Sequence, residues 1–153
     1  MERQGRRQQR SWASVLEDRR GVAALELGIL LPVLLMVLVG IVQAGVLYNN
    51  FIELNNAVRV ASRVFAASRG SATPLSSATS NANASAPNLT SISWTFSVAG
   101  TSCGTDAACG SALTAAAGGT AGVAATYPCD LTILGVNYAP GCTLSSQTAE
   151  RIE

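Results

Sequence analysis

The sequence predicts an α+β fold in which a long N-terminal helix spans a membrane and precedes a small, β-rich, disulfide-bonded C-terminal domain. The first observation is that residues 27–48 are almost wholly apolar and carry no charge. At about 1.5 Å per helical residue, they are long enough to cross a hydrocarbon core of about 30 Å. The second is the strict alternation of polar and apolar residues over 91–98, which is typical of a half-buried strand. The third is that all four cysteines follow this segment.

Composition divides the chain into five segments. We expect a leader at 1–21, a transmembrane helix at 22–48, an amphipathic extension of that helix at 49–69, a linker at 70–90, and a β-rich domain with two disulfides at 91–153. The linker is built mainly of serine, alanine, threonine and asparagine. The chain is therefore predicted to be one small domain attached to one membrane segment.

The charges are distributed unevenly on the two sides of the apolar run. Residues 1–21 carry six arginines against three acids, a net charge of +3, whereas residues 22–153 carry four arginines against six acids, a net charge of −2. Because the more positive flank of a membrane helix stays in the cytoplasm, we expect a cytoplasmic N-terminus. A basic tail can also bind nucleic acid, but Trp12 is the only aromatic residue in this one, and we expect no nucleic-acid partner.

A basic pair, a glycine and a glutamate lie together where the leader meets the apolar run. They are Arg19, Arg20, Gly21 and Glu26, and the glutamate is the fifth residue after the glycine. This arrangement resembles the processing site of prepilin-like proteins. With Leu27 after the glutamate and Pro32 soon after, residues 19–69 most resemble the TadE-like family, the minor pseudopilins of tight-adherence (Flp) pilus systems.

The resemblance implies that a prepilin peptidase cuts after Gly21 and makes Val22 the new N-terminus. The basic pair, Glu26 and Leu27 are then the recognition and assembly segment, and the Glu26 carboxylate pairs with the N-terminal amine of a neighbouring subunit. The implied partners are the peptidase, other pilin-like subunits and the bacterial inner membrane, with the C-terminal domain in the periplasm or outside the cell. The implied function is that of a minor pilin or pseudopilin in the assembly of a Flp type IV pilus.

Two other interpretations stay open. One is an uncleaved, membrane-anchored periplasmic interaction module. The other is a secreted, disulfide-bonded protein, with Arg19 and Arg20 as a twin-arginine signal and a signal-peptidase site after Ala44. Against release, the apolar run is longer than a signal-peptide core of about 7–15 residues, and the helical pattern continues past Ala44. The residue at the mature N-terminus separates the three interpretations: Val22, Met1 or Gly45.

Small residues recur one turn apart in the apolar run. Ala24 and Gly28 form one such pair, and Gly40 and Ala44 form another. This spacing lets helices approach closely in lipid, so it favours contact with other pilin-like helices. Pro32 lacks a backbone N–H, and we expect it to bend the helix.

A helical stripe continues past the membrane at intervals of three and four residues. It consists of Leu47, Phe51, Leu54, Val58, Ala61 and Phe65. The opposite face is polar and consists of Glu53, Asn55, Asn56, Arg59, Ser62 and Arg63. This pattern predicts an amphipathic helix whose stripe packs on the C-terminal domain in its water-side half, while other pilin-like helices are the alternative partner for the rest. Gly70 has the position of a C-cap that ends such a helix.

The C-terminal domain contains one clear strand, at 91–98. Ile92, Trp94, Phe96 and Val98 share one face of it. The alanine-, glycine-, serine- and threonine-rich segment that follows, 99–125, has no assigned structure.

The end of the chain is predicted to form a hairpin. We expect a second strand at 131–138, a turn at 139–141 and a return strand at 142–144. The polar tail, 145–153, is expected to form a short edge strand or helix.

The cysteines are even in number and lie on the predicted outer side of the membrane, where disulfides form. Cys103, Cys109, Cys129 and Cys142 allow three pairings. We favour Cys103 with Cys109 and Cys129 with Cys142, because short loops cost the least entropy to close. A zinc site is the alternative, but neither pair has the gap of roughly two to four residues usual for zinc ligands, so we expect no metal.

Histidine and lysine are both absent from the chain. Their absence removes the commonest general base and the amine that forms Schiff bases. Asp106 and Asp130 are the only carboxylates between Glu53 and Glu150, and we interpret both as solvated surface groups. We therefore expect no enzyme, no catalytic residue, no cofactor and no small-molecule substrate.

Overall fold

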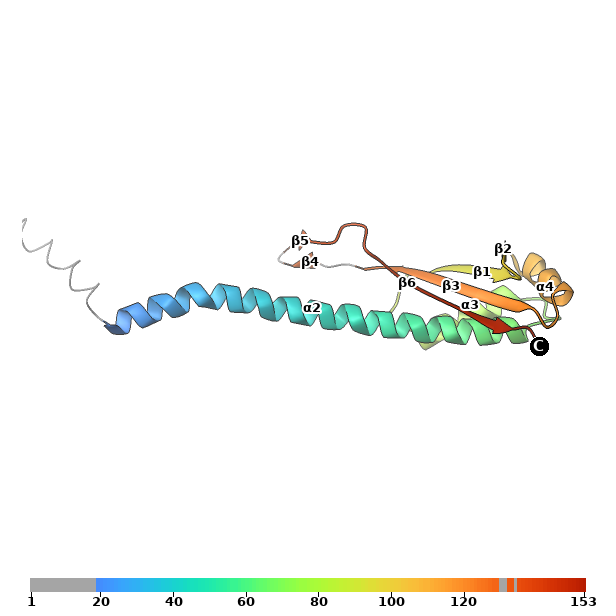
Figure 1. Ribbon diagram of the computed structural model, residues 1–153, viewed down its shortest axis with the longest axis horizontal. Coiled ribbons are helices and arrows are strands. Elements are labelled where there is room, and N and C mark those ends of the chain that lie inside the picture. Colours follow the sequence, from blue (N-terminus) through green and yellow to red (C-terminus); the bar gives the residue numbers. More distant parts are fainter. Residues whose placement is uncertain (1–18, 130–131, 134) are drawn as a thin grey trace, which may run out of the picture. The chain divides into compact units, whose positions relative to one another are not determined.

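The structure is a computed structural model and describes residues 19–129, 132–133 and 135–153 (Figure 1). The helices and strands of these residues are α2 (Arg19–Ala67), α3 (Pro74–Ser85), β1 (Ser93–Val98), β2 (Thr101–Cys103), α4 (Asp106–Ala115), β3 (Thr120–Pro128), β4 (Thr132–Ile133), β5 (Val136–Asn137) and β6 (Thr143–Arg151). Contacts divide the chain into two compact units, Met1–Val42 and Gln43–Glu153. The predicted α+β class is confirmed. Residues 1–18 of the predicted leader lie outside the described residues.

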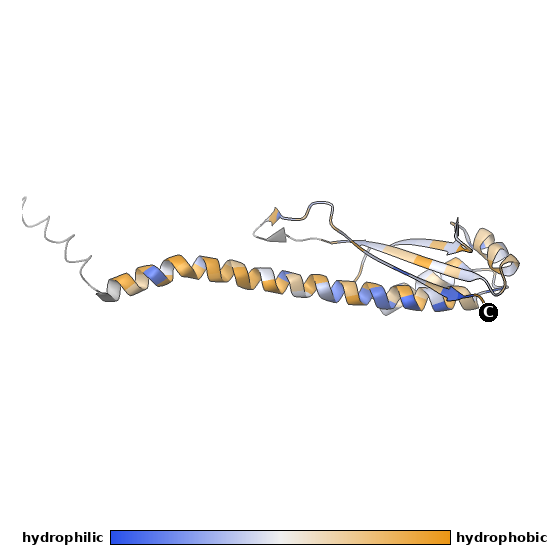
Figure 2. Ribbon diagram, in the orientation of Figure 1, coloured by the Kyte–Doolittle hydropathy of each residue, from blue (hydrophilic) through white to orange (hydrophobic). Residues whose placement is uncertain are grey.

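Helix α2 runs without a break from Arg19 through Pro32 to Ala67. Side chains from Val22 to Val42 are exposed almost throughout, and Figure 2 shows this part of the helix as predominantly hydrophobic. Such a helix is typical of a membrane span. By length and composition, Val22–Ala67 is able to cross a membrane.

The end of α2 follows the predicted pattern. The Ser68 N–H donates to the carbonyl O of Phe65 at 3.1 Å, which tightens the last turn. Gly70 then adopts a φ of +80°, a conformation that residues with a side chain rarely adopt. The helix stops at Ala67, within two residues of the predicted end at 69.

Four strands form an antiparallel sheet in the order β2-β1-β3-β6. Phe96 of β1 pairs with Val123 of β3, which pairs with Thr148 of β6. The strand predicted over 91–98 is confirmed as β1. The segment that had no assigned structure, 99–125, contains β2, α4 and the first part of β3.

The core joins α2, α3, α4 and one face of the sheet. Its buried members are Leu54, Ala57, Val58, Ala61, Phe65, Ala66, Ala78, Ala82, Ala86, Leu89, Phe96, Val98, Cys109, Leu113, Ala121, Val123, Ala125 and Ile152. The rings of Phe65 and Phe96 lie 4.9 Å apart. The predicted packing of the α2 stripe on the domain is thus confirmed from Leu54 onward, whereas Phe51 is 39% exposed.

Ser62 does not lie on the exposed polar face where we expected it. It is fully buried, and its Oγ donates to the carbonyl O of Arg59 at 3.0 Å. A serine hydroxyl can be satisfied inside its own helix in this way, so its burial leaves no unpaired group.

The interpretation of 70–90 as a linker was wrong, because Pro74–Ser85 form helix α3. Pro74, Ala78 and Ala82 are buried, and their spacing of four residues places them on one face. Pro74 occupies the first turn, where its fixed φ suits a helix and its missing N–H is not needed. The methyl groups of alanines therefore give α3 a buried face, although its sequence is of low complexity.

The single strand predicted over 131–138 was also wrong. The described part of this segment forms two short strands, β4 and β5, which pair with each other. Gly135 lies between them with a φ of +80°, as a tight reversal requires. The turn predicted over 139–141 is confirmed, with Gly141 also at +80°.

Strand β6 combines the predicted return strand with most of the polar tail. It pairs with β3 over its whole length, from Thr143 opposite Pro128 to Arg151 opposite Thr120. Of the two structures expected for the tail, the edge strand is confirmed.

Both preferred disulfides are present. Cys103–Cys109 joins β2 to α4, and Cys129–Cys142 closes the end of the β3–β6 ladder. The Cys129 N–H also donates to the carbonyl O of Cys142 at 3.1 Å. The disulfide therefore separates the paired sheet from the β4–β5 loop.

Candidate functional site

The segment singled out by the sequence lies at the start of α2. The backbone of Arg19, Arg20, Gly21 and Val22 forms its first residues. Glu26 follows one turn after Val22, so the two lie on the same face of the helix. The predicted cleavage site and the predicted assembly carboxylate are thus brought together by helical geometry alone.

Glu26 is the only charged residue between Gly21 and Glu53. Its side chain is exposed, as are those of its apolar neighbours Leu25 and Leu27. An exposed apolar surface with one carboxylate is suited to association in lipid, where the carboxylate needs a cation or polar partner.

The small residues of the apolar run are open to approach. A Cβ atom built on Gly28 or Gly40 would meet no atom within 4 Å. Ala24 and Ala44, each one turn from one of these glycines, are exposed. The described residues therefore leave the predicted helix-packing positions accessible, and Pro32 lies among them without interrupting α2.

Sequence reasoning missed a polar cluster around Glu53. The Nδ2 atoms of Asn49 and Asn88 donate to Glu53 Oε1 at 3.1 Å and 2.8 Å. In the part of the chain that the structure describes, the buried Oε2 atom has no hydrogen-bond partner. The cluster ties α2 to the segment before β1. The isolated charge of Glu53 on a half-apolar helix was the one feature of the sequence that could have indicated it.

Sequence reasoning also missed the role of Asp106. Its Oδ1 accepts hydrogen bonds from the backbone N–H groups of Leu75 at 2.7 Å and Ser76 at 2.9 Å, and the Ser76 hydroxyl donates to Oδ2. The hydrogen bonds from Ser76 hold the pKa of Asp106 below its ordinary value of 3.8. Asp106 is therefore a cap for α3 and not merely a solvated surface group.

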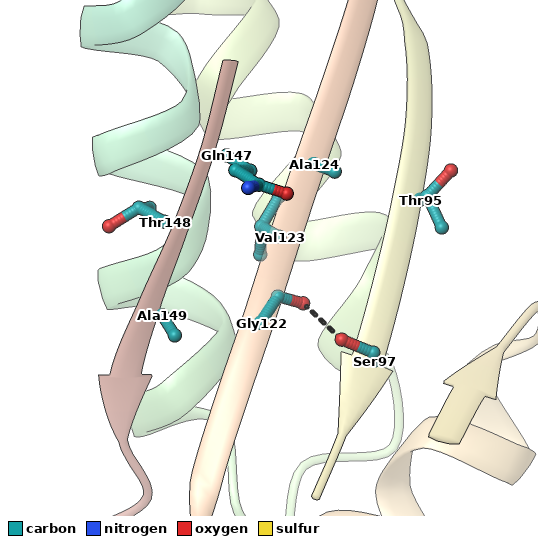
Figure 3. A pocket seen from close by; sticks show the side chains of 8 residues that line it. All are labelled: Thr95, Ser97, Gly122, Val123, Ala124, Gln147, Thr148 and Ala149. Carbon is teal, nitrogen blue, oxygen red and sulfur yellow. Dashed lines mark hydrogen bonds between the residues drawn. The ribbon is translucent and has the colours of Figure 1, made fainter. Parts of the chain in front are cut away.

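The outer face of the sheet carries a shallow depression across β1, β3 and β6 (Figure 3). Small or uncharged side chains line it, including Thr95, Ser97, Ala124 and Gln147. The Ser97 hydroxyl donates to the carbonyl O of Gly122 at 3.4 Å. This lining offers no titratable side chain for acid–base chemistry.

A family model described as "TadE-like protein" matches residues 21–63. The match begins at the glycine of the proposed cleavage site and ends in the part of α2 that packs in the core. Searches of curated proteins and of solved structures found no match. Over residues 21–63 this chain is therefore similar to TadE-like proteins, and the resemblance drawn from its N-terminal sequence is confirmed.

Proposed function

We propose that this chain is a minor pilin-like subunit that takes part in the assembly of a tight-adherence (Flp) pilus. The observation that carries the proposal is the TadE-like match, which includes Gly21, Glu26 and the apolar part of α2. In this proposal the leader is removed after Gly21 by a prepilin peptidase, and Val22 becomes the N-terminus.

The subunit is anchored in the bacterial inner membrane by α2. The arginine-rich leader favours a cytoplasmic N-terminus, which places the sheet domain in the periplasm or outside the cell. The two disulfides agree with an oxidising compartment. Other pilin-like subunits contact the exposed apolar part of the helix.

Glu26 selects the register between neighbouring subunits. A carboxylate costs up to about 2.5–3.5 kcal/mol at the centre of a membrane helix and less near the interface. The new ammonium group on Val22 of a neighbour offsets this cost only when the two groups meet. One alignment of the helices is therefore favoured over all others.

N-terminal sequencing of the protein recovered from cells tests the proposal. A mature chain that begins at Val22 supports it. A chain that begins at Met1 would support an uncleaved anchor, and one that begins at Gly45 would support a secreted protein. The last product would keep the whole core, since the compact unit begins at Gln43.

Substitution of Gly21 tests the same cleavage independently. Gly21→Ala is expected to leave a full-length precursor on a gel. Gly28→Ala is the matched control, because it changes a glycine of the same helix with open space around it. Normal processing of Gly21→Ala would contradict the proposed peptidase site.

Substitution of Glu26 tests the assembly role. Glu26→Gln removes the charge and keeps the shape, so the chain should still insert and be processed, but pilus number per cell should fall. Glu26→Asp keeps the charge and should retain more assembly. If cells with Glu26→Gln make pili in normal number by electron microscopy, the carboxylate does not direct assembly.

A further inference from the structure

The loop closed by the Cys129–Cys142 disulfide carries an unusual pair of side chains. In the described residues from Leu54 onward, Val136 and Tyr138 are the only large hydrophobic side chains that are exposed, at 55% and 63%. They lie in residues 135–141, the β5 loop, which contains no charged residue. The other large apolar side chains that the structure describes in this domain are buried or partly buried, so these two are unusual in their exposure.

Two contacts fix the direction of β6 along α2. The Ser146 hydroxyl donates to Asn55 Oδ1 at 2.6 Å. Farther along α2, the ring of Phe65 packs on Phe96 of β1. Phe96 pairs with Val123 of β3, which pairs with Thr148 of β6, so these three residues lie in one row across the sheet. A later residue of β6 thus lies near a later residue of α2, and the two elements advance in the same direction.

This direction places the start of β6 at the edge of the apolar run. Thr143 precedes Ser146 by three residues, or about 10 Å of strand. The same distance along α2 is about seven residues, which leads back from Asn55 to Tyr48. Tyr48 is the last residue of the uncharged apolar run. The Cys129–Cys142 disulfide therefore lies at the level where the predicted membrane span ends.

The β5 loop is attached to this end of the sheet. Strands β4 and β5 follow the Pro128 end of β3 and precede the Thr143 end of β6 (Figure 1). The disulfide holds these two ends with their Cα atoms 5.2 Å apart at the base of the loop. The loop is thus held at the end of the domain that is nearer to the membrane.

We propose that the β5 loop lies in the interfacial layer of the membrane that anchors α2. Val136 and Tyr138 contact phospholipid there. Tyrosine is favoured at this depth because its ring is apolar and its hydroxyl reaches the headgroups, and the absence of charge removes the main cost of entry. The proposal rests on the membrane anchor of the proposed function but not on its cleavage. The domain then contacts the membrane at two points, the helix and the loop.

Photo-crosslinking in intact membranes tests this contact. A photoreactive benzoylphenylalanine replaces Tyr138 in the full-length chain, which is a small change at an exposed aromatic position. Leu35, in the middle of the apolar run, is the positive control. Thr95, which is exposed on β1, is the negative control. Adducts are identified by mass as lipid or protein.

The proposal expects lipid adducts at positions 138 and 35 and none at position 95. Protein adducts alone at 138, or none, would overturn it while position 35 still reports lipid, because the loop would then face another subunit or water. Absence of lipid adducts at 35 would instead overturn the membrane anchor itself and the loop contact with it. The two failures are therefore distinguishable.

Discussion

At Asp106, one carboxylate joins two helices through hydrogen bonds to residues 30 and 31 positions earlier in the sequence. It occupies the first turn of α4 and accepts hydrogen bonds from the first turn of α3, through Leu75 and Ser76. A charge at this place also complements the positive end of the α3 dipole. The Asp106 side chain is partly exposed, but its position is fixed by these donors.

Replacement of Asp106 should change how stability depends on pH. Because the folded-state pKa lies below the ordinary value of 3.8, the carboxylate stabilises the fold above that pH, and this contribution is lost as the pH falls through the folded-state value. Asp106→Asn should lower Tm by a few degrees at neutral pH and lose less stability on acidification below 3.8. Thermal unfolding followed by circular dichroism measures both effects.

The control for this prediction is Glu153→Gln, which removes an exposed carboxylate at the end of the chain. It should leave both Tm and the acid dependence nearly unchanged. Equal acid sensitivity of Asp106→Asn and the unsubstituted chain would show that the cap does not titrate with folding.

Among the elements, α2 has two different surfaces along its length. Up to Ile52 its large apolar side chains are exposed or half-buried, whereas from Leu54 its stripe is buried in the core. One helix therefore presents an apolar surface outward and then supplies the largest side chains of the domain interior.

Two phenylalanines on this helix provide a matched test. Phe65 is fully buried and Phe51 is 39% exposed. Phe65→Ala should destabilise the domain by about 3–5 kcal/mol, as is usual for a buried ring, and Phe51→Ala by much less. Urea unfolding in detergent micelles measures the two differences, and equal losses would contradict the assignment of the core.

Sequence predicted the elements that have large side chains at regular spacing. The stripe through Leu54, Val58 and Phe65 indicated α2, and the alternation around Phe96 indicated β1. Helix α3 was missed because its buried positions are mainly alanines, although Pro74 after Thr73 was a usable start signal. Strand β3 was missed for the same reason, since Gly122 and its alanine neighbours weaken the alternation.

The candidate site divides in the same way. The charge of Glu26 in an apolar run can be recognised from the sequence alone, and so can Gly21 before it. The Glu53–Asn88 contact joins residues 35 apart, and no local pattern announces such a pairing. The position of the β5 loop likewise depends on the β3–β6 register, which only the folded sheet defines.

For the whole molecule, the division at Gln43 separates two structural units of different composition. All the buried core residues belong to the second unit. The first unit contributes exposed apolar surface and the first part of the segment that matches the family, which continues into the second unit as far as residue 63.

A fragment that begins at Gly45 should fold on its own. It keeps every core residue of α2, so its urea midpoint should equal that of the full chain. A fragment that begins at Gly70 lacks Leu54, Val58 and Phe65 and should stay unfolded. Near-ultraviolet circular dichroism checks both, and a folded second fragment would show that the sheet does not need α2.

The many alanines of this core make enlargement harmful at almost half of its positions. Where large side chains fill an interior, truncation is the harmful change, but alanine accounts for eight of the eighteen buried cluster residues here. Enlargement at such a position forces two backbones apart and typically costs about 1–3 kcal/mol. Sequence change at the buried alanine positions is therefore limited to side chains of similar size. New functional side chains can be added to this domain only at its surface.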